Sequence, residues 1–132
     1  MKIIGIGTEI VECLRIRRLI DRQGEQFLAR VFTEREIRYC QARRQSTELF
    51  AGRWAAKEAV RKCLQPSAVN DFAWTEIEVR TDAKGASKVL VHGAMKELAL
   101  ARKVTGFQIS MAHCRAYATA YAIAVAKSGD EQ

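Results

Sequence analysis

The order of apolar and polar residues predicts that the chain begins with a strand followed by an amphipathic helix. Residues 2–7 are rich in β-branched side chains, which favours a short first strand. Over residues 9–22 the apolar positions recur with the period of a helix and gather on one broad face. Arg15, Arg18 and Arg22 fall together on the opposite face. We therefore expect a helix with one apolar and one basic side.

Two further helices are predicted from their start and stop signals. Thr33 is followed three residues later by Glu36, which is the capping-box pattern of a helix N-terminus. That helix is expected to continue to about residue 42. Another helix is expected from about residue 47 to Gln65, because the proline that follows disfavours helical geometry in the residue before it.

The second half of the chain has the pattern of strands. Alternation over residues 76–80 predicts a half-exposed strand, and a turn sequence then leads to a partner strand over residues 87–92. Residues 93–103 are expected to form a helix, and residues 104–113 and 116–126 two closing strands. These elements predict an α+β fold, with the early helices packed on a mainly antiparallel sheet.

A chain of 132 residues has the length of one compact domain, and we treat residues 1–132 as one, with a flexible tail at the end. In the last predicted strand, five alanines at every second position from 118 to 126 alternate with larger side chains. A face made only of alanine lets another layer approach closely. We therefore expect a tightly packed helix or a neighbouring subunit against it.

Composition points to a cytoplasmic protein. No stretch approaches the roughly 20 apolar residues that a membrane span needs, and the first residues lack the cleavage pattern of a signal peptide. The four cysteines stand far apart with no C-x-x-C spacing, which is typical of reduced thiols rather than of disulfides or a zinc site. They are Cys13, Cys40, Cys63 and Cys114.

The formal net charge is +7, and nine arginines fall within the first third of the chain. A basic surface of this kind attracts polyanions through long-range electrostatics. Nucleic acid, an anionic membrane surface and an acidic protein all fit, and charge alone does not choose among them.

Several charged residues have plain structural explanations when spacing alone is considered. Glu58 and Lys62 are four residues apart in a predicted helix, which suits a surface ion pair worth a few tenths of a kcal/mol. Glu9 suits the first turn of a helix, where the helix dipole favours an anion. His113 suits a structural role at a strand end, and the arginines of the first helix suit a solvated face.

A family resemblance favours functional roles for these residues over the structural explanations. Residues 52–59 resemble the G-R-[FW]-A-A-K-E-A segment of the holo-acyl-carrier-protein synthases, the small bacterial class of phosphopantetheinyl transferases. Residues 5–12 resemble that family's G-I-G-x-D-[IV]-x-E, residues 27–36 its F-x-x-R-[VI]-[FL]-T-x-x-E, and residues 109–113 its [VI]-S-[IL]-[ST]-H. The resemblance covers residues 1–126, with four blocks in order at the right separations.

The resemblance implies a role for each matching residue. Glu9 and Glu58 stand where the family binds magnesium, and Lys62 where it has a lysine near the coenzyme A phosphates. Arg53 and His113 match residues that line the coenzyme A pocket. A metal ion at the two carboxylates would stabilise the departing nucleotide. Glu58 is the first candidate for the base that takes the proton of the carrier serine, and Lys62 is the second.

The family also implies the fold, reaction and partners. We expect the 4′-phosphopantetheinyl transferase fold, and transfer of phosphopantetheine from coenzyme A to a serine of apo-acyl carrier protein for fatty acid biosynthesis. Arg15, Arg18 and Arg22 would receive the acidic carrier protein, and family members are typically homotrimers with active sites between subunits.

Two departures from the family pattern leave other functions open. The family usually has aspartate where this chain has Glu9, and it has a glycine-containing loop where residues 63–70 here have no glycine. The alternatives are a small basic nucleic-acid-binding module, for which the chain has no binding motif, and a catalytically degenerate relative. The transferase is favoured because the second carboxylate, the lysine and the histidine remain.

Overall fold

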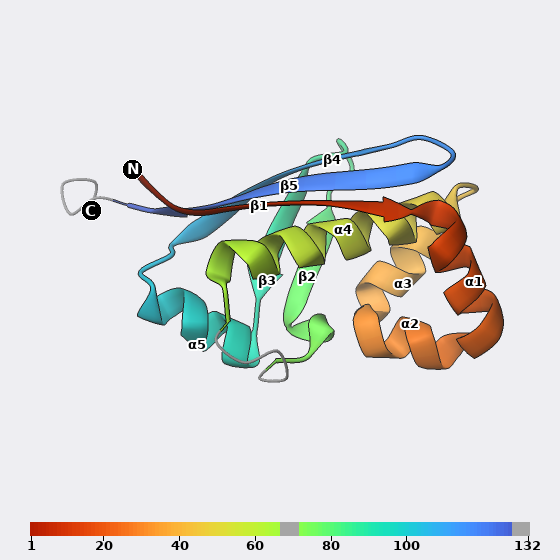
Figure 1. Ribbon diagram of the computed structural model, residues 1–132, viewed down its shortest axis with the longest axis horizontal. Coiled ribbons are helices and arrows are strands. Elements are labelled where there is room, and N and C mark those ends of the chain that lie inside the picture. Colours follow the sequence, from red (N-terminus) through yellow and green to blue (C-terminus); the bar gives the residue numbers. More distant parts are fainter. Residues whose placement is uncertain (67–71, 128–132) are drawn as a thin grey trace.

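The computed structural model describes residues 1–66 and 72–127 (Figure 1). The expected tail, residues 128–132, and most of the glycine-free loop, residues 67–70, lie outside the described residues. The elements in chain order are β1 (Lys2–Glu12), α1 (Cys13–Gln23), α2 (Glu25–Val31), α3 (Glu34–Gln41), α4 (Ser46–Leu64), η1 (Trp74–Glu76), β2 (Ile77–Thr81), β3 (Ser87–Val91), α5 (Gly93–Ala101), β4 (Gly106–His113) and β5 (Tyr117–Ala126). The predicted α+β class is confirmed.

The centre of the fold is a three-stranded antiparallel sheet with the order β1-β5-β4. The helices all lie on one side of this sheet, and α4 runs directly along it (Figure 1). Strands β2 and β3 form a separate antiparallel hairpin. Among the described residues, no helix is both long and apolar enough to cross a membrane.

Helix α4 packs against the sheet at close range because small residues line the contact. The five alanines of β5 are all buried, and the thiol of Cys63 in α4 donates a hydrogen bond to the carbonyl of Ala122, 3.2 Å away. A helix therefore covers the alanine face. The sequence left open whether a helix or a neighbouring subunit packs against this face, and in this chain it is helix α4.

Two glycines bring β1 equally close to α4. A Cβ atom added at Gly7 would lie 1.9 Å from the carbonyl oxygen of Ala59, and one added at Gly5 would lie 2.2 Å from that of Cys63. Real atoms never approach so closely. The glycines thus let the backbone of β1 rest on α4, and this contact sets the position of the following residues of the strand.

We expect Gly7→Ala to lower the free energy of unfolding by about 1–3 kcal/mol, because the methyl group forces β1 away from α4. Gly52→Ala is the matched control, since a Cβ there meets nothing within 4 Å and alanine favours a helix by up to about 1 kcal/mol. Urea unfolding of both variants checks the prediction. Equal stability of Gly7→Ala and the unmodified protein would contradict the close packing.

The first predicted helix begins later than expected. Residues 9–12 belong to β1, where Glu9 pairs with Ala120 and Glu12 with Tyr117, and α1 begins at Cys13. Pairing with a strand more than 100 residues away decides this, and the local periodicity could not show it. Glu9 is therefore not in the first turn of a helix, and Ile10 is exposed rather than part of an apolar helix face. Helix α2 was not predicted.

The other predicted elements are confirmed with small shifts of their ends. Thr33 caps α3 with the expected reciprocal pattern, in which its hydroxyl accepts from the Glu36 amide and the Glu36 carboxylate accepts from the Thr33 amide. Strand β2, however, is not half-exposed, because Ile77, Glu78 and Val79 are all buried.

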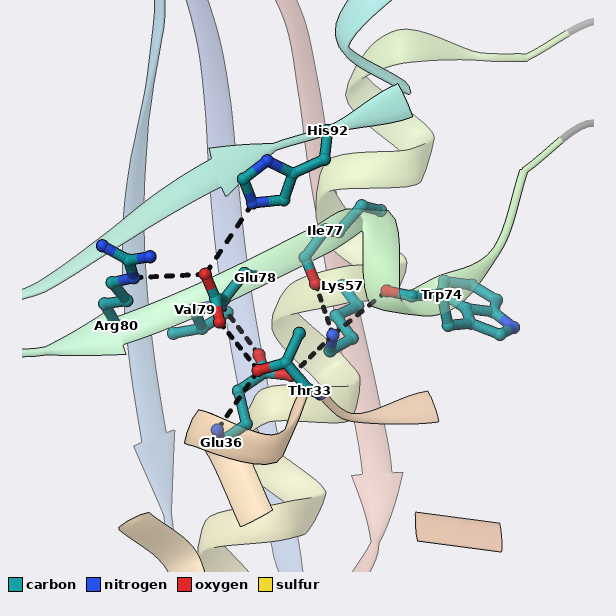
Figure 2. A network of polar contacts seen from close by, with 9 residues as sticks. All are labelled: Thr33, Glu36, Lys57, Trp74, Ile77, Glu78, Val79, Arg80 and His92. Carbon is teal, nitrogen blue, oxygen red and sulfur yellow. Dashed lines mark hydrogen bonds and ion pairs between the residues drawn. The ribbon is translucent and has the colours of Figure 1, made fainter. Parts of the chain in front are cut away.

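The polar residue Glu78 of β2 is buried because it joins a network between α3, α4 and β2 (Figure 2). Lys57 and Glu36 are fully buried, and their side chains form an ion pair of 2.8 Å. The Lys57 ammonium also donates to the carbonyls of Trp74, 3.1 Å away, and Ile77. The second Glu36 oxygen accepts from the Val79 amide at 2.8 Å. All three protons of the ammonium group are therefore used.

Burial lowers the pKa of Lys57, while the neighbouring Glu36 carboxylate opposes that shift. The network continues through Thr33, whose hydroxyl donates to Glu78 at 2.8 Å. Glu78 in turn accepts from Arg80 at 3.1 Å and lies 3.8 Å from His92 (Figure 2). This network anchors the middle of α4, one residue before Glu58.

Candidate active site

Two carboxyl groups from different elements meet where β1 crosses α4. Glu9 follows the glycines of β1, and Glu58 lies on α4 one residue before Ala59, whose carbonyl contacts Gly7. The carboxyl groups of Glu9 and Glu58 are hydrogen-bonded to each other. The sheet–helix contact thus places together two residues that are 49 positions apart in the sequence.

The pKa values of the two carboxyl groups move in opposite directions. Burial, and then the hydrogen bond with Glu9, raises the pKa of Glu58. For Glu9 burial also raises the pKa, but the hydrogen bonds from Glu58 and from the Ile10 amide and the charge of Lys62 outweigh it, so that its pKa is lowered. The two neighbouring carboxyl groups therefore differ in how readily each one binds a proton, with Glu58 the more basic of the two.

Each carboxyl group has its own cation. The ammonium of Lys62 lies 3.6 Å from Glu9 and donates to the carbonyl of Thr8 at 2.9 Å. The Arg61 guanidinium lies 3.8 Å from Glu58. We call Glu9, Glu58, Arg61 and Lys62 the carboxylate cluster. The plain explanation for Glu58 and Lys62, an ion pair within one helix, is not what forms, because Lys62 pairs across to β1.

Arg53 and His113 line a different cavity, of about 190 Å³, which we call the Arg53 pocket. The Arg53 side chain is buried, donates to the Thr81 hydroxyl at 2.6 Å and lies over the Tyr39 ring at 4.2 Å. Its Nε has no hydrogen-bond partner among the described residues. His113 is within 3.2 Å of the Gln45 amide oxygen. The pocket therefore has a buried cation with a free donor.

The carboxylate cluster and the Arg53 pocket are separate on one chain. Arg53 and Glu58 are five residues apart on α4, which turns them about 140° from each other around the helix axis. No member of the carboxylate cluster lines the pocket. The structure therefore brings Glu9, Glu58 and Lys62 together, and Arg53 and His113 together, at two places.

The three arginines of α1 also lie together. Arg15, Arg18 and Arg22 line an open groove of about 390 Å³, whose other lining residues are Glu12, Leu14 and Leu19. Arginine guanidinium groups beside exposed leucine suit an acidic, amphipathic partner.

Lys57 and Arg61 were missed in the sequence. Lys57 stands between Ala56 and Glu58 within a run of small residues, and a lysine at such a position signals either a buried ion pair or a functional group. Its partner Glu36 had been explained as a helix cap only. Arg61 gave no signal beyond its place between Glu58 and Lys62.

The donor set of the carboxylate cluster fits magnesium. Mg²⁺ prefers oxygen ligands and is commonly bound by one or two carboxylates together with water and substrate phosphates. Glu9 and Glu58 provide two such carboxylates, and their shared hydrogen bond keeps the oxygens side by side. Within residues 1–66 and 72–127 no cluster of three or more His, Cys, Asp or Glu side chains offers a fuller protein cage.

Comparison with known proteins identifies the family. The family model described as the 4′-phosphopantetheinyl transferase superfamily matches residues 5–126. The chain belongs to this superfamily. The transferase fold and enzyme class expected from the four sequence blocks are confirmed, and a nucleic-acid-binding module is not supported.

Individual relatives agree with the family model. The transferase is 41% identical over 123 residues to the holo-[acyl-carrier-protein] synthase of Rhodopirellula baltica, covering 93% of this chain and 98% of that protein. The crystal structure of the synthase from Neisseria meningitidis superimposes with a TM-score of 0.83 at 27% identity, covering 93% of this chain and 98% of that one. The Helicobacter pylori synthase in complex with coenzyme A gives a TM-score of 0.79 at 26% identity, with 91% and 99% covered.

Proposed function

We propose that this transferase moves the 4′-phosphopantetheine group from coenzyme A to a serine hydroxyl of apo-acyl carrier protein and releases adenosine 3′,5′-bisphosphate. The observation that carries the proposal is the meeting of Glu9, Glu58 and Lys62 at one place in a chain of this superfamily. The names of the relatives, and the coenzyme A bound to one of them, support the substrate pair.

The carboxylate cluster suits this reaction. We propose that Glu9 and Glu58 hold Mg²⁺, which when bound would draw negative charge from the coenzyme A diphosphate. Lys62, which is held by the carbonyl of Thr8, places a positive charge beside the same phosphates and so favours departure of the nucleotide. Because Glu9 has one methylene more than the aspartate typical of the family, it reaches the metal directly or through water.

The serine hydroxyl must lose its proton as it attacks phosphorus. We propose Glu58 as the acceptor, directly or through water, because burial and its neighbour Glu9 raise its pKa toward the range useful for a base. Lys62 is the second candidate. In this proposal the ester bond forms between the serine oxygen and phosphorus while the bond from phosphorus to the nucleotide oxygen breaks.

We propose that the protein is a homotrimer in which the Arg53 pocket of one chain faces the carboxylate cluster of another, so that coenzyme A spans both. The separation of these two places on one chain supports this. The helices leave the outer face of the sheet uncovered (Figure 1). The strands β1 and β5 of this sheet also carry large exposed apolar side chains, namely Ile6, Ile10, Tyr117 and Tyr121. Apolar faces of this kind mark protein interfaces. Native mass spectrometry is expected to show a complex with the mass of three identical chains. A mass equal to that of one chain would contradict the shared site.

We place the reaction in fatty acid biosynthesis and the protein in the cytoplasm. The location is supported by the four cysteines, all within the described residues and all free thiols. The basic groove on α1 is the proposed contact for the carrier protein, because acidic helices complement it in charge.

The double variant Arg15→Glu/Arg18→Glu is expected to raise KM for the carrier protein about tenfold or more, while the affinity for coenzyme A stays the same. The reason is that reversed charges repel an acidic partner at the groove. Steady-state kinetics with varied carrier concentration measures this. Arg35→Glu/Arg38→Glu on α3 makes the same change in net charge, and an equal rise in its KM would contradict docking at α1.

The proposed reaction is tested by chromatography of the nucleotide products. With apo-carrier protein, coenzyme A and magnesium, we expect adenosine 3′,5′-bisphosphate to accumulate in step with carrier consumed. A carrier whose acceptor serine is replaced by alanine should give none. Release that is equal with and without the acceptor serine would show hydrolysis instead and would overturn the proposal.

A further inference from the structure

Arg61 is the member of the carboxylate cluster for which the proposed function gives no role. It lies in the last turn of α4, three residues after Glu58 and directly before Lys62. Its side chain is 31% exposed. Its guanidinium contacts the Glu58 carboxylate at 3.8 Å, which is too long for a hydrogen bond. Within the described residues this is its one polar side-chain contact. The five N–H donors of Arg61 are therefore not satisfied by the protein.

The two cations of the cluster are held differently. Lys62 is fixed by a 2.9 Å hydrogen bond to the carbonyl of Thr8 in addition to its contact with Glu9. Arg61 has only the loose contact with a carboxyl group that the proposed function assigns to a metal ion. A carboxylate that gives its lone pairs to a metal has less to offer a guanidinium. Arg61 is thus the cation that is free to turn to an arriving anion.

We propose that Arg61 is a further coenzyme A-binding residue, whose guanidinium moves from Glu58 to the diphosphate when the substrate binds. This inference rests on the proposed function. The diphosphate is the expected target because it is the anion that adjoins a metal held by Glu58. Arginine suits it because its planar fork can donate two parallel hydrogen bonds to phosphate oxygens, which an ammonium group does not match.

The second departure from the family pattern supports the same role. Where the family has a glycine-containing loop after this helix, the chain has no glycine in residues 63–70. Backbone donors of a glycine-rich loop are a common means of holding phosphates. A side-chain donor in the last turn of α4, such as Arg61, would supply positive charge and hydrogen bonds of the same kind.

The test is calorimetric titration of coenzyme A into the magnesium-loaded protein and its Arg61→Gln variant. We expect Arg61→Gln to weaken coenzyme A binding about tenfold to a hundredfold, the range for losing charge-assisted hydrogen bonds. Arg61→Lys should fall between the two, because it keeps the charge but not the fork. Arg35→Gln, an exposed arginine on α3, is the matched control and should bind as the unmodified protein does.

Two further titrations separate this role from general damage. The affinity of the free Arg61→Gln protein for Mg²⁺ should stay equal or become tighter, because a positive charge has left Glu58. Dephospho-coenzyme A, which lacks the 3′-phosphate, should lose affinity by the same factor as coenzyme A. Unchanged coenzyme A affinity, a loss confined to ligands with the 3′-phosphate, or a parallel loss of Mg²⁺ affinity would each overturn the inference.

Failure of the proposed function would look different. In that case the transferase without substitutions would bind coenzyme A but would not modify any apo-carrier protein. The comparison between Arg61→Gln and Arg35→Gln would still measure the effect of Arg61 on coenzyme A affinity.

Discussion

Glu58→Gln is expected to lower kcat/KM for phosphopantetheine transfer by about 10²–10⁴-fold, because the variant loses both a proposed magnesium ligand and the first candidate for the base. The side chain keeps its size, and Glu58 is only partly buried, so the fold should be preserved. Mg²⁺ affinity, measured by calorimetry on the free protein, should fall as well. Activity and metal affinity are thus expected to fall together.

Glu34→Gln is the matched control, since Glu34 is an exposed carboxylate that pairs with Arg38 at 3.7 Å. It should leave both quantities unchanged. Full activity of Glu58→Gln would contradict the roles given to Glu58. A loss of activity with normal Mg²⁺ binding would restrict Glu58 to proton transfer.

Lys57→Met is expected to lower the free energy of unfolding by about 3–5 kcal/mol, because it leaves the Glu36 carboxylate buried without its cation. The carbonyls of Trp74 and Ile77 lose a donor at the same time. Urea unfolding followed by circular dichroism measures the change. Because the network anchors α4 beside Glu58, activity should fall as stability does.

Lys62→Met is the control for the charge itself, since Lys62 is a partly exposed lysine of the same helix and a surface ion pair contributes about 1 kcal/mol or less. Adding Glu36→Leu to Lys57→Met removes the unpaired carboxylate and should recover part of the stability. A loss of less than 1 kcal/mol in Lys57→Met would show that the buried ion pair does not hold α4.

Elements fixed by local signals were predicted from the sequence. The capping box of Thr33 and Glu36, the end of α4 before Pro66 and the turn between β2 and β3 all depend on residues within a few positions of one another. The extension of β1 to Glu12 depends instead on pairing with β5. Local periodicity over residues 9–22 therefore misplaced the start of the helix.

The candidate site could be predicted only in part for the same reason. Spacing suggested an ion pair between Glu58 and Lys62, but the contacts formed are Glu58 with Arg61 and Lys62 with Glu9. The meeting of Glu9 with Glu58 was implied by family resemblance, and no local pattern indicated it. The burial of Lys57 depends on partners from three elements, which the sequence does not bring together.

The measurement that tests the central claim most directly is the intact mass of an apo-acyl carrier protein after incubation with this transferase, coenzyme A and magnesium. We predict a mass gain of one phosphopantetheine group, which should be absent with a chelator and strongly slowed with Glu58→Gln. An unchanged carrier mass with several carrier proteins and metals would contradict the account, and Glu9 in place of aspartate would be the first residue to revert.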